Sequence, residues 1–274
     1  MSEPASRLHS GALTVVCCAS PAYEPFLVRS LETIPHDVRV VVVFHGATGP
    51  RMALSHPGLE IVVPRDASGP FRRGYLMNVG ARQVLTSHVL LADADHLYFP
   101  GFFALLESYL DPGRVLRVFL GRLGEATSAR ILLGQLKWAE SFSDFAGTQG
   151  GFAQRHPRLG RVLRRVGLVG PLDREYEIVY GTYNPCVYAA TDFAALRGYD
   201  ESFEGWGVED DDLTERGRRA GLRDLRIPAI VGHLFHGTAL HAAGYHDPVR
   251  EVWKRRVLGT RRTVNSGGWG DLKG

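Results

Sequence analysis

The sequence predicts an α/β fold whose central, mostly parallel sheet is flanked by helices. Short apolar or β-branched runs alternate with helix-like stretches, which is the rhythm of strand–helix–strand units. The runs are continuously apolar rather than alternating with polar residues, which indicates strands covered by helices on both faces. The predicted strands cover residues 13–18, 39–44, 59–63, 89–92, 115–120, 186–190 and 229–235, and the predicted helices cover residues 25–34, 75–85, 129–142 and 248–257.

Length and composition indicate one soluble domain. With 274 residues, of which 45% are hydrophobic and 22% charged, the chain can bury a single substantial core. The formal charge of +3 and the lack of a basic helix with interleaved aromatic residues argue against a nucleic-acid partner. No apolar run approaches the roughly 20 residues of a membrane span. Residues 1–4 lack the features of a secretory signal, so we expect no transmembrane segment and a cytoplasmic location.

The cysteine count points to the same compartment. Cys17, Cys18 and Cys186 cannot all pair with one another, and the first two lie in an apolar run. We therefore expect buried free thiols in a reducing environment.

One acidic segment follows two glycines and a tryptophan, in the run Gly205-Trp206-Gly207-Val208-Glu209-Asp210-Asp211-Asp212. Adjacent carboxylates repel one another and are costly to bury. The glycines let the backbone approach a ligand, and Trp206 offers a flat apolar face that suits a sugar ring. The alternative is a helix start, because acids stabilise the first helical turn. We assign Asp211 and Asp212 to that structural role and keep Glu209 and Asp210 as catalytic candidates.

A second acidic segment ends an apolar run. Residues 88–92 are followed by Asp93-Ala94-Asp95-His96. In open α/β sheets ligands bind beyond the carboxyl ends of strands, and two carboxylates there favour a hard divalent cation that bridges phosphate oxygens. An Asp-x-Asp pair alone is equally compatible with an ordinary loop, so the neighbouring motifs decide between the two.

Several separate segments, in a fixed order, resemble one family. They are Phe71-Arg72-Arg73-Gly74-Tyr75-Leu76-Met77-Asn78-Val79-Gly80, Asp93-Ala94-Asp95, Tyr183-Asn184-Pro185-Cys186, Gly198-Tyr199-Asp200, the Trp-Gly-x-Glu-Asp-Asp run and Val231-Gly232-His233. Over about residues 12–240 the chain is similar to GT-A-fold glycosyltransferases of the β-1,4-galactosyltransferase and chondroitin-polymerase-like group. The Trp-Gly-x-Glu-Asp-Asp run is the specific part of this resemblance.

The resemblance implies a metal site. Asp95 is the expected first ligand, with Asp93 beside it as a second ligand or as a contact to the nucleotide ribose, and His233 completes the set. His236 is a rival, but residues three apart on a strand face opposite sides, so we expect only one of the two histidines to bind and favour His233. An imidazole ligand suits manganese better than magnesium, so Mn2+ is the expected cofactor, with Mg2+ as the alternative.

The resemblance also implies catalytic roles. Asp210 would act as the base that takes a proton from the attacking acceptor hydroxyl, and Glu209 would orient acceptor hydroxyls. Related retaining transferases tend to carry Asn at the position of Asp210, so this Asp favours an inverting reaction.

The donor site is expected to include Arg73, Asn78, Asp93, Asn184 and Trp206. Arg73, rather than the neighbouring Arg72, would pair with the diphosphate. Asn78 would cap its helix or touch the donor, and Asn184 would line the donor pocket or serve a turn beside Pro185. The chain departs from many GT-A enzymes at Phe44-His45-Gly46, because it lacks the acid that holds the nucleotide base there. The identity of the nucleotide base of the donor therefore stays open.

The resemblance divides the single domain into four parts: a nucleotide-sugar-binding half (1–125), an acceptor-side insertion (126–176), a catalytic and acceptor half (177–246) and a C-terminal helix and tail (247–274). Arginines cluster at 155–165 within the insertion, which favours a solvated flap but would also suit an anionic membrane surface or an acidic acceptor.

The expected function is that of a metal-dependent inverting glycosyltransferase. It would move a sugar from a nucleotide diphosphate, expected to be UDP, to a hydroxyl of a saccharide, glycolipid or small natural product. The alternatives are a non-catalytic nucleotide- or glycan-binding module and a nucleotidyltransferase. The latter calls for a phosphate-cradling glycine loop that the sequence lacks near its first strand.

Overall fold

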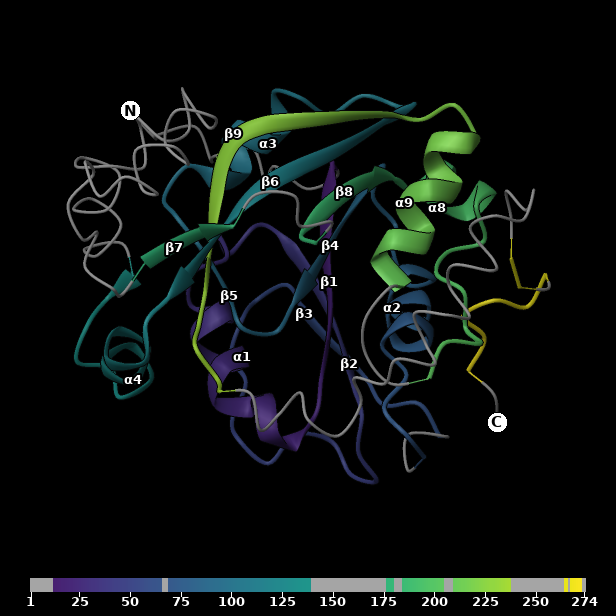
Figure 1. Cartoon of the computed structure of the whole chain (residues 1–274). Coiled ribbons are helices and arrows are strands. Elements are labelled where there is room, and N and C mark those ends of the chain that lie inside the picture. Colours follow the sequence, from purple (N-terminus) through teal and green to yellow (C-terminus); the bar gives the residue numbers. More distant parts are fainter. Residues whose placement is uncertain are drawn as a thin grey trace, which may run out of the picture.

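The computed structural model describes residues 12–65, 69–138, 184–204, 209–237, 264–265 and 267–272, and the backbone of residues 176–179 (Figure 1). The predicted strand–helix alternation is present. The final helix predicted at 248–257, most of the insertion and Trp206 lie outside the described residues.

One sheet of nine strands runs through the described part of the chain in the order β3-β2-β1-β4-β8-β6-β9-β5, with β7 paired to β6. The strands are β1 (Leu13–Ala19), β2 (Arg39–Phe44), β3 (Leu59–Val62), β4 (His88–Asp93), β5 (His96–Tyr98), β6 (Arg114–Leu123), β7 (Tyr176–Val179), β8 (Cys186–Ala189) and β9 (Arg223–His233). The first four are mutually parallel, as predicted, whereas β8 is antiparallel to both β4 and β6, and β5 is antiparallel to β9. The α/β fold is thus confirmed, with a sheet that becomes mixed in its second half.

Helices cover both faces of the sheet (Figure 1). α1 (Glu24–Leu31), which follows the short η1 (Pro21–Tyr23), packs with α3 (Phe102–Glu107) on one face. α2 (Arg73–Ala81), α8 (Ala190–Ala195) and α9 (Glu209–Arg219) pack on the other. All seven residues of β1 are buried, which explains why its sequence is apolar without alternation.

α2 lies directly on β1 and β2. A Cβ atom at Gly80 would come within 2.5 Å of Val16 and 2.9 Å of Val43, so only glycine permits this approach. The close packing fixes the N-terminal residue of α2, Arg73, beside the carboxyl end of β4, where Asp93 lies.

Several element boundaries differ from the sequence prediction. α4 (Glu125–Leu132) begins before residue 129 and ends well before 142, and the short elements β5, β7, α3 and α8 were not predicted. All three cysteines are buried and free, as expected, and burial raises the pKa of Cys18 and of Cys186 to about 12. Among the described residues, none of the helices has the length and apolar character needed to cross a membrane.

Candidate functional site

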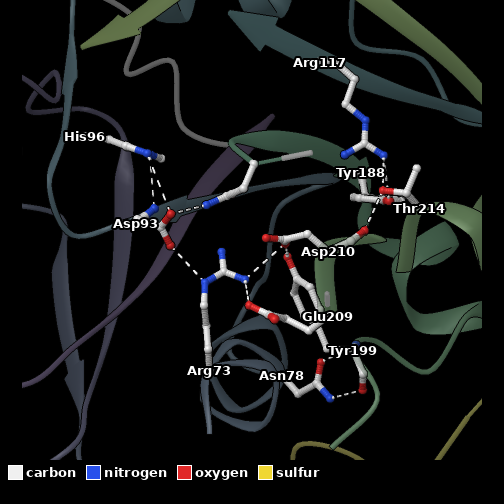
Figure 2. Close-up of polar contacts among 11 residues, drawn as sticks. Arg73, Asn78, Asp93, His96, Arg117, Tyr188, Tyr199, Glu209, Asp210 and Thr214 are labelled. Carbon is white, nitrogen blue, oxygen red and sulfur yellow. Dashed lines mark hydrogen bonds and ion pairs between the residues drawn. The ribbon is translucent and has the colours of Figure 1, made fainter. Parts of the chain in front are cut away.

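A single arginine joins the two acidic segments. Arg73 is 1% exposed, and its Nε donates to Asp93 Oδ1 at 2.9 Å. Its Nη1 donates to Asp210 Oδ1 at 3.1 Å and to Glu209 Oε1 at 3.3 Å, as Figure 2 shows. The acidic run near residue 94 and the run near residue 210 therefore meet in one site.

These contacts give Arg73 protein partners that the sequence analysis did not predict. Burial disfavours a charged guanidinium, but Asp210 and Asp93 outweigh this effect and hold the pKa of Arg73 well above its ordinary value. Three carboxylates of the protein thus share the charge of Arg73. Its Nη2 is buried without a hydrogen-bond partner among the described residues, which leaves one donor for a ligand.

Asp93 is held from two sides. Besides Arg73, the amide Nδ2 of Asn184 donates to Asp93 Oδ2 at 2.6 Å. The sheet explains this contact, because β8 runs antiparallel to β4 and its start therefore lies beside the end of β4. Burial raises the pKa of Asp93, but Arg73 and His96 lower it by more, so the net pKa lies below its ordinary value and the carboxyl group stays ionised. Asn184 thus lies at the site, and its Oδ1 is buried without a partner in the described part of the chain.

Asp95 lies in the short connection between β4 and β5 and faces two histidines. His236 Nε2 is 3.1 Å and His233 Nε2 is 3.5 Å from Asp95 Oδ2. We expected only one of the two histidines to bind, on the premise that both lie on a strand, and this premise is wrong. β9 ends at His233, so His236 is no longer on a strand and both imidazoles reach the same carboxylate.

The chemistry of this group fits a divalent cation. Both carboxylate oxygens of Asp95 are buried, and Oδ1 has no hydrogen-bond partner among the residues described. Burial raises the pKa of Asp95, but His233 and His236 lower it well below its ordinary value, so the group is ionised. A buried carboxylate beside two imidazoles is a mixed oxygen and nitrogen ligand set, which suits manganese better than magnesium.

His96 was not predicted to have a role. Its Nδ1 accepts a hydrogen bond from the Asp93 backbone N–H at 3.1 Å, so in a neutral ring Nε2 carries the proton. One ligand atom each from Asp95, His96 and His233 lie within 4.8 Å of one another, but the protonated Nε2 has no lone pair for a metal. His96 Nε2 is therefore a hydrogen-bond donor that lies 3.8 Å from Asp93 Oδ2. In the sequence, this role of His96 is indicated by its position directly after Asp95.

The start of α9 carries the second group of acids. Asp210 Oδ1 accepts hydrogen bonds from Arg73 Nη1 and from the Tyr199 hydroxyl, the latter at 2.8 Å. The Asp210 side chain is still 23% exposed, and Oδ2 has no protein partner among the described residues. One oxygen is thus fixed while the other can accept a proton.

Asp211 and Asp212 lie in the first turn, as predicted, and Asp212 pairs with Arg216 at 2.8 Å.

Glu209 is 2% exposed, and its carboxylate contacts Arg73. This burial does not suit the direct contact with acceptor hydroxyls that the resemblance implies, and the contacts support an action through Arg73 and Asp210. Burial, together with the neighbouring Asp210, raises the pKa of Glu209 to about 7.

The raised pKa of Glu209 predicts a pH dependence of stability. Between the ordinary pKa of 4.5 and about 7 the folded state holds one more proton than the unfolded state, so the unfolding free energy falls as pH rises through this window. The expected fall in the unfolding free energy of the wild type is on the order of 2 kcal/mol. Glu209→Gln cannot ionise, so it should reduce this fall. Denaturant unfolding from pH 5 to pH 8 with a chelator present measures it. Glu32→Gln, in an exposed ion pair, is the matched control. Parallel pH curves for Glu209→Gln and wild type would contradict the burial argument.

Asn78 makes its hydrogen bonds to the segment around Tyr199. It is fully buried within α2, where its Oδ1 accepts from the Tyr199 backbone N–H at 2.8 Å. Its Nδ2 donates to the Tyr199 carbonyl and to Glu201 Oε1, both at 2.9 Å. Asn78 lies in the interior of α2, whose N-cap is Arg72, so the predicted helix-cap role is corrected to one in which Asn78 holds the Tyr199 backbone. The predicted contact with the donor stays a prediction.

A cavity of about 560 Å³ lies beside β5. Its lining comes from α1, β5 and the segment after α4, and includes Arg29, Thr33, Tyr98 and Trp138. None of the predicted site residues lines it, so the site is assigned from the side-chain contacts above.

One family model matches in the second half of the chain. Residues 174–240 match the family described as the N-terminal domain of galactosyltransferase. Human β-1,4-galactosyltransferase 3 is 38% identical over 60 residues, which are 21% of this chain and 15% of that protein. Human chondroitin sulfate synthase 3 is 30% identical over 102 residues, which are 30% of this chain and 11% of that protein. The chain thus spans only a small part of the curated relatives it matches.

Structural comparisons extend the similarity to the whole fold. S. aureus TarS residues 1–349, in complex with UDP-GlcNAc, gives a TM-score of 0.58 at 13% identity, covering 95% of this chain and 69% of that one. The catalytic domain of Drosophila β1,4-galactosyltransferase 7, in complex with xylobiose, gives 0.50 at 15% identity, covering 94% and 82%. The chain therefore has the fold of GT-A glycosyltransferases, and its residues 174–240 are homologous to the galactosyltransferase region.

Proposed function

We propose that this chain is a metal-dependent inverting glycosyltransferase that uses a UDP-sugar. The observation that carries the proposal is Arg73, which ties Asp93 of the expected nucleotide and metal side to Asp210 of the expected acceptor side. Arg73 thus holds the expected donor side and a partly exposed base close together. A transfer reaction needs this closeness, because donor and acceptor must meet in one place.

The metal would be held by Asp95 together with His233 and His236, with Asp93 beside them. When bound, a divalent cation neutralises the charge that develops on the leaving diphosphate. Arg73 Nη2 and His96 Nε2 are the buried donors next to this group, and both suit a phosphate or sugar oxygen.

Asp210 would be the general base. The acceptor oxygen forms a bond to the anomeric carbon as the bond from that carbon to the diphosphate breaks, and the hydroxyl proton passes to Asp210 Oδ2. Attack from the face opposite the diphosphate inverts the anomeric configuration. Arg73 and Tyr199 fix Oδ1, so the carboxylate does not have to reorient during the reaction.

The structural relatives suggest the substrate classes. TarS is seen with UDP-GlcNAc and the Drosophila enzyme with xylobiose. We therefore propose UDP activation of a hexose, N-acetylhexosamine or uronic acid, and a saccharide acceptor, with glycolipids and small natural products as further acceptor classes. Within this scheme residues 1–125 form the nucleotide-sugar half and residues 177–246 the catalytic half.

Thermal unfolding with a panel of nucleotide sugars tests the proposal. A ligand that binds only the folded protein adds about 2.7 kcal/mol at a concentration of 100 Kd, so UDP and one UDP-sugar should raise the Tm when Mn2+ is present and much less without it. The anomeric configuration of the product, read by NMR, should be inverted. A retained configuration would reject the mechanism, and binding without any turnover would point to a glycan-binding module instead.

The metal ligands give a separate prediction. Asp95→Asn should abolish the manganese-dependent rise in Tm, because it removes the only anionic ligand flanked by both histidines. His233→Ala and His236→Ala should each weaken manganese affinity by at least the roughly 10–100-fold that loss of a supporting residue costs. His96→Ala should weaken it less, because its Nε2 carries a proton. Calorimetric titration with MnCl2 checks this order, and a loss for His96→Ala equal to that for His233→Ala would make His96 a ligand.

A further inference from the structure

We infer that the C-terminal strap, defined as residues 264, 265 and 267–272, positions the base Asp210 by holding Tyr199. This inference rests on the proposed function, because it names what fixes the geometry of that base. The strap does not touch Asp210 itself, so its residues would be positioning residues rather than catalytic ones.

Tyr199 is the link to the base. Its side chain is fully buried, and its hydroxyl donates to Asp210 Oδ1 at 2.8 Å. The Arg73 guanidinium carbon lies 5.5 Å from the centre of the Tyr199 ring, so the ring also packs against the other donor to Asp210. A displacement of Tyr199 would therefore disturb both contacts on Asp210 Oδ1.

Two asparagine side chains clamp the backbone of Tyr199. Figure 2 shows Asn78 on the backbone side of Tyr199, with Asp210 at its hydroxyl end. On the strap, Asn265 Nδ2 donates to the Tyr199 carbonyl at 2.6 Å and to the Arg197 carbonyl at 2.8 Å. The Asn265 Oδ1 accepts from the Glu201 backbone N–H at 3.0 Å. Asn265 thus contacts the backbone of Arg197, Tyr199 and Glu201, with Tyr199 in the middle.

The strap is anchored on the same helix that carries Asn78. Trp269 is buried against Phe193, with ring centroids 5.8 Å apart, and Gly270 N–H donates to Glu201 Oε1 at 2.5 Å. Gly270 has φ +66°, and a Cβ there would lie 2.6 Å from the Asn78 carbonyl oxygen, so glycine is required. The Tyr75 hydroxyl donates to the Asp271 carbonyl at 3.3 Å. Tyr199 is therefore held between α2 and a segment far away in the sequence.

A double-mutant cycle separates positioning from plain stabilisation. Tyr199→Phe keeps the ring and removes the hydrogen bond to Asp210, and should lower kcat on the order of 10-fold, the effect of one bond to a charged group. Asn265→Ala should lower kcat several-fold in the wild type, with donor KM and manganese affinity within about twofold. In the Tyr199→Phe background the same change should cost less in kcat than in the wild type, because the hydrogen-bonded part of the link is already removed and only the ring contact with Arg73 remains. Asp111→Asn, whose carboxylate pairs with Arg114 at 3.0 Å outside the strap and the site, is the matched control and should leave kcat unchanged.

An equal loss of kcat in both backgrounds, or no loss in the wild type, would overturn the inference. If Asn265→Ala does not fold, Asn265→Asp serves instead, since it keeps the acceptor for Glu201 and loses the donor to Tyr199. A second readout needs no turnover. In protein labelled with [4-13C]aspartate, Asn265→Ala should move the Asp210 carboxyl resonance in the same direction as Tyr199→Phe. A resonance unmoved by Asn265→Ala would reject the strap's role even if the protein transferred no sugar.

Discussion

Asp210→Asn should lower kcat by about 10²–10⁴-fold, the contribution of a positioned general base. The amide oxygen of Asn can still accept the hydrogen bonds from Arg73 and Tyr199, so the site keeps its shape. It cannot take the acceptor proton at neutral pH. Steady-state kinetics with the donor and acceptor found by the binding screen measure the loss.

Binding should be nearly unaffected by Asp210→Asn. UDP and manganese affinities are expected to stay within about twofold of wild type, because neither expected ligand group includes Asp210. Asp211→Asn, the next residue in the same helical turn, is the matched control and should retain its turnover. Turnover of Asp210→Asn near the wild-type rate would remove Asp210 as the base, and a loss of UDP binding would show that it shapes the donor site instead.

Arg73→Met should destabilise the folded protein by roughly 3–5 kcal/mol, the cost of leaving buried charges unpaired. Arg73 is the shared partner of Asp93, Glu209 and Asp210, and methionine fills a similar volume without the charge. Urea unfolding at pH 7 without metal measures the change. Arg82→Met, at an exposed ion pair with Asp271, should change the unfolding free energy by less than about 1 kcal/mol.

The loss caused by Arg73→Met should shrink at acid pH. In the wild type Arg73 lowers the pKa of Asp93, so this carboxylate contributes stability above its unfolded pKa and loses it as pH falls. The variant lacks that contribution at every pH. The difference between the two proteins should therefore be larger at pH 7 than at pH 4, and a constant difference would show that Arg73 acts by packing alone.

The continuous apolar runs made the first part of the fold predictable. β1, β2 and β4 are buried on both faces, so their sequences carry a strong signal, and Asp93 is the last residue of the third of these strands. β8 has only four residues, yet its apolar run was predicted at 186–190, whereas β5 has only three residues, too few for a periodic pattern, and was not predicted. The antiparallel pairing of β8 and of β5 could not be predicted, because it depends on how strands distant in the sequence meet in the sheet.

The residue types of the site were predictable, but several of their contacts were not. Arg73 was expected to bind a phosphate, yet its partners are decided by burial among three carboxylates, which depends on how α2 and α9 pack. His236 reaches Asp95 because β9 ends at His233, a boundary that the sequence does not mark. The Tyr199 hydroxyl lies within the recognised Gly-Tyr-Asp segment, but only the fold brings it to Asp210.

Crystals soaked with MnCl2 and UDP test the central claim most directly, because the anomalous signal of manganese locates the ion without assumptions. We predict one strong peak bound by Asp95 and the two histidines, with the UDP diphosphate on the ion and next to the carboxylates that Arg73 joins. A peak elsewhere, or UDP bound away from Asp93 and Asp95, would contradict the account.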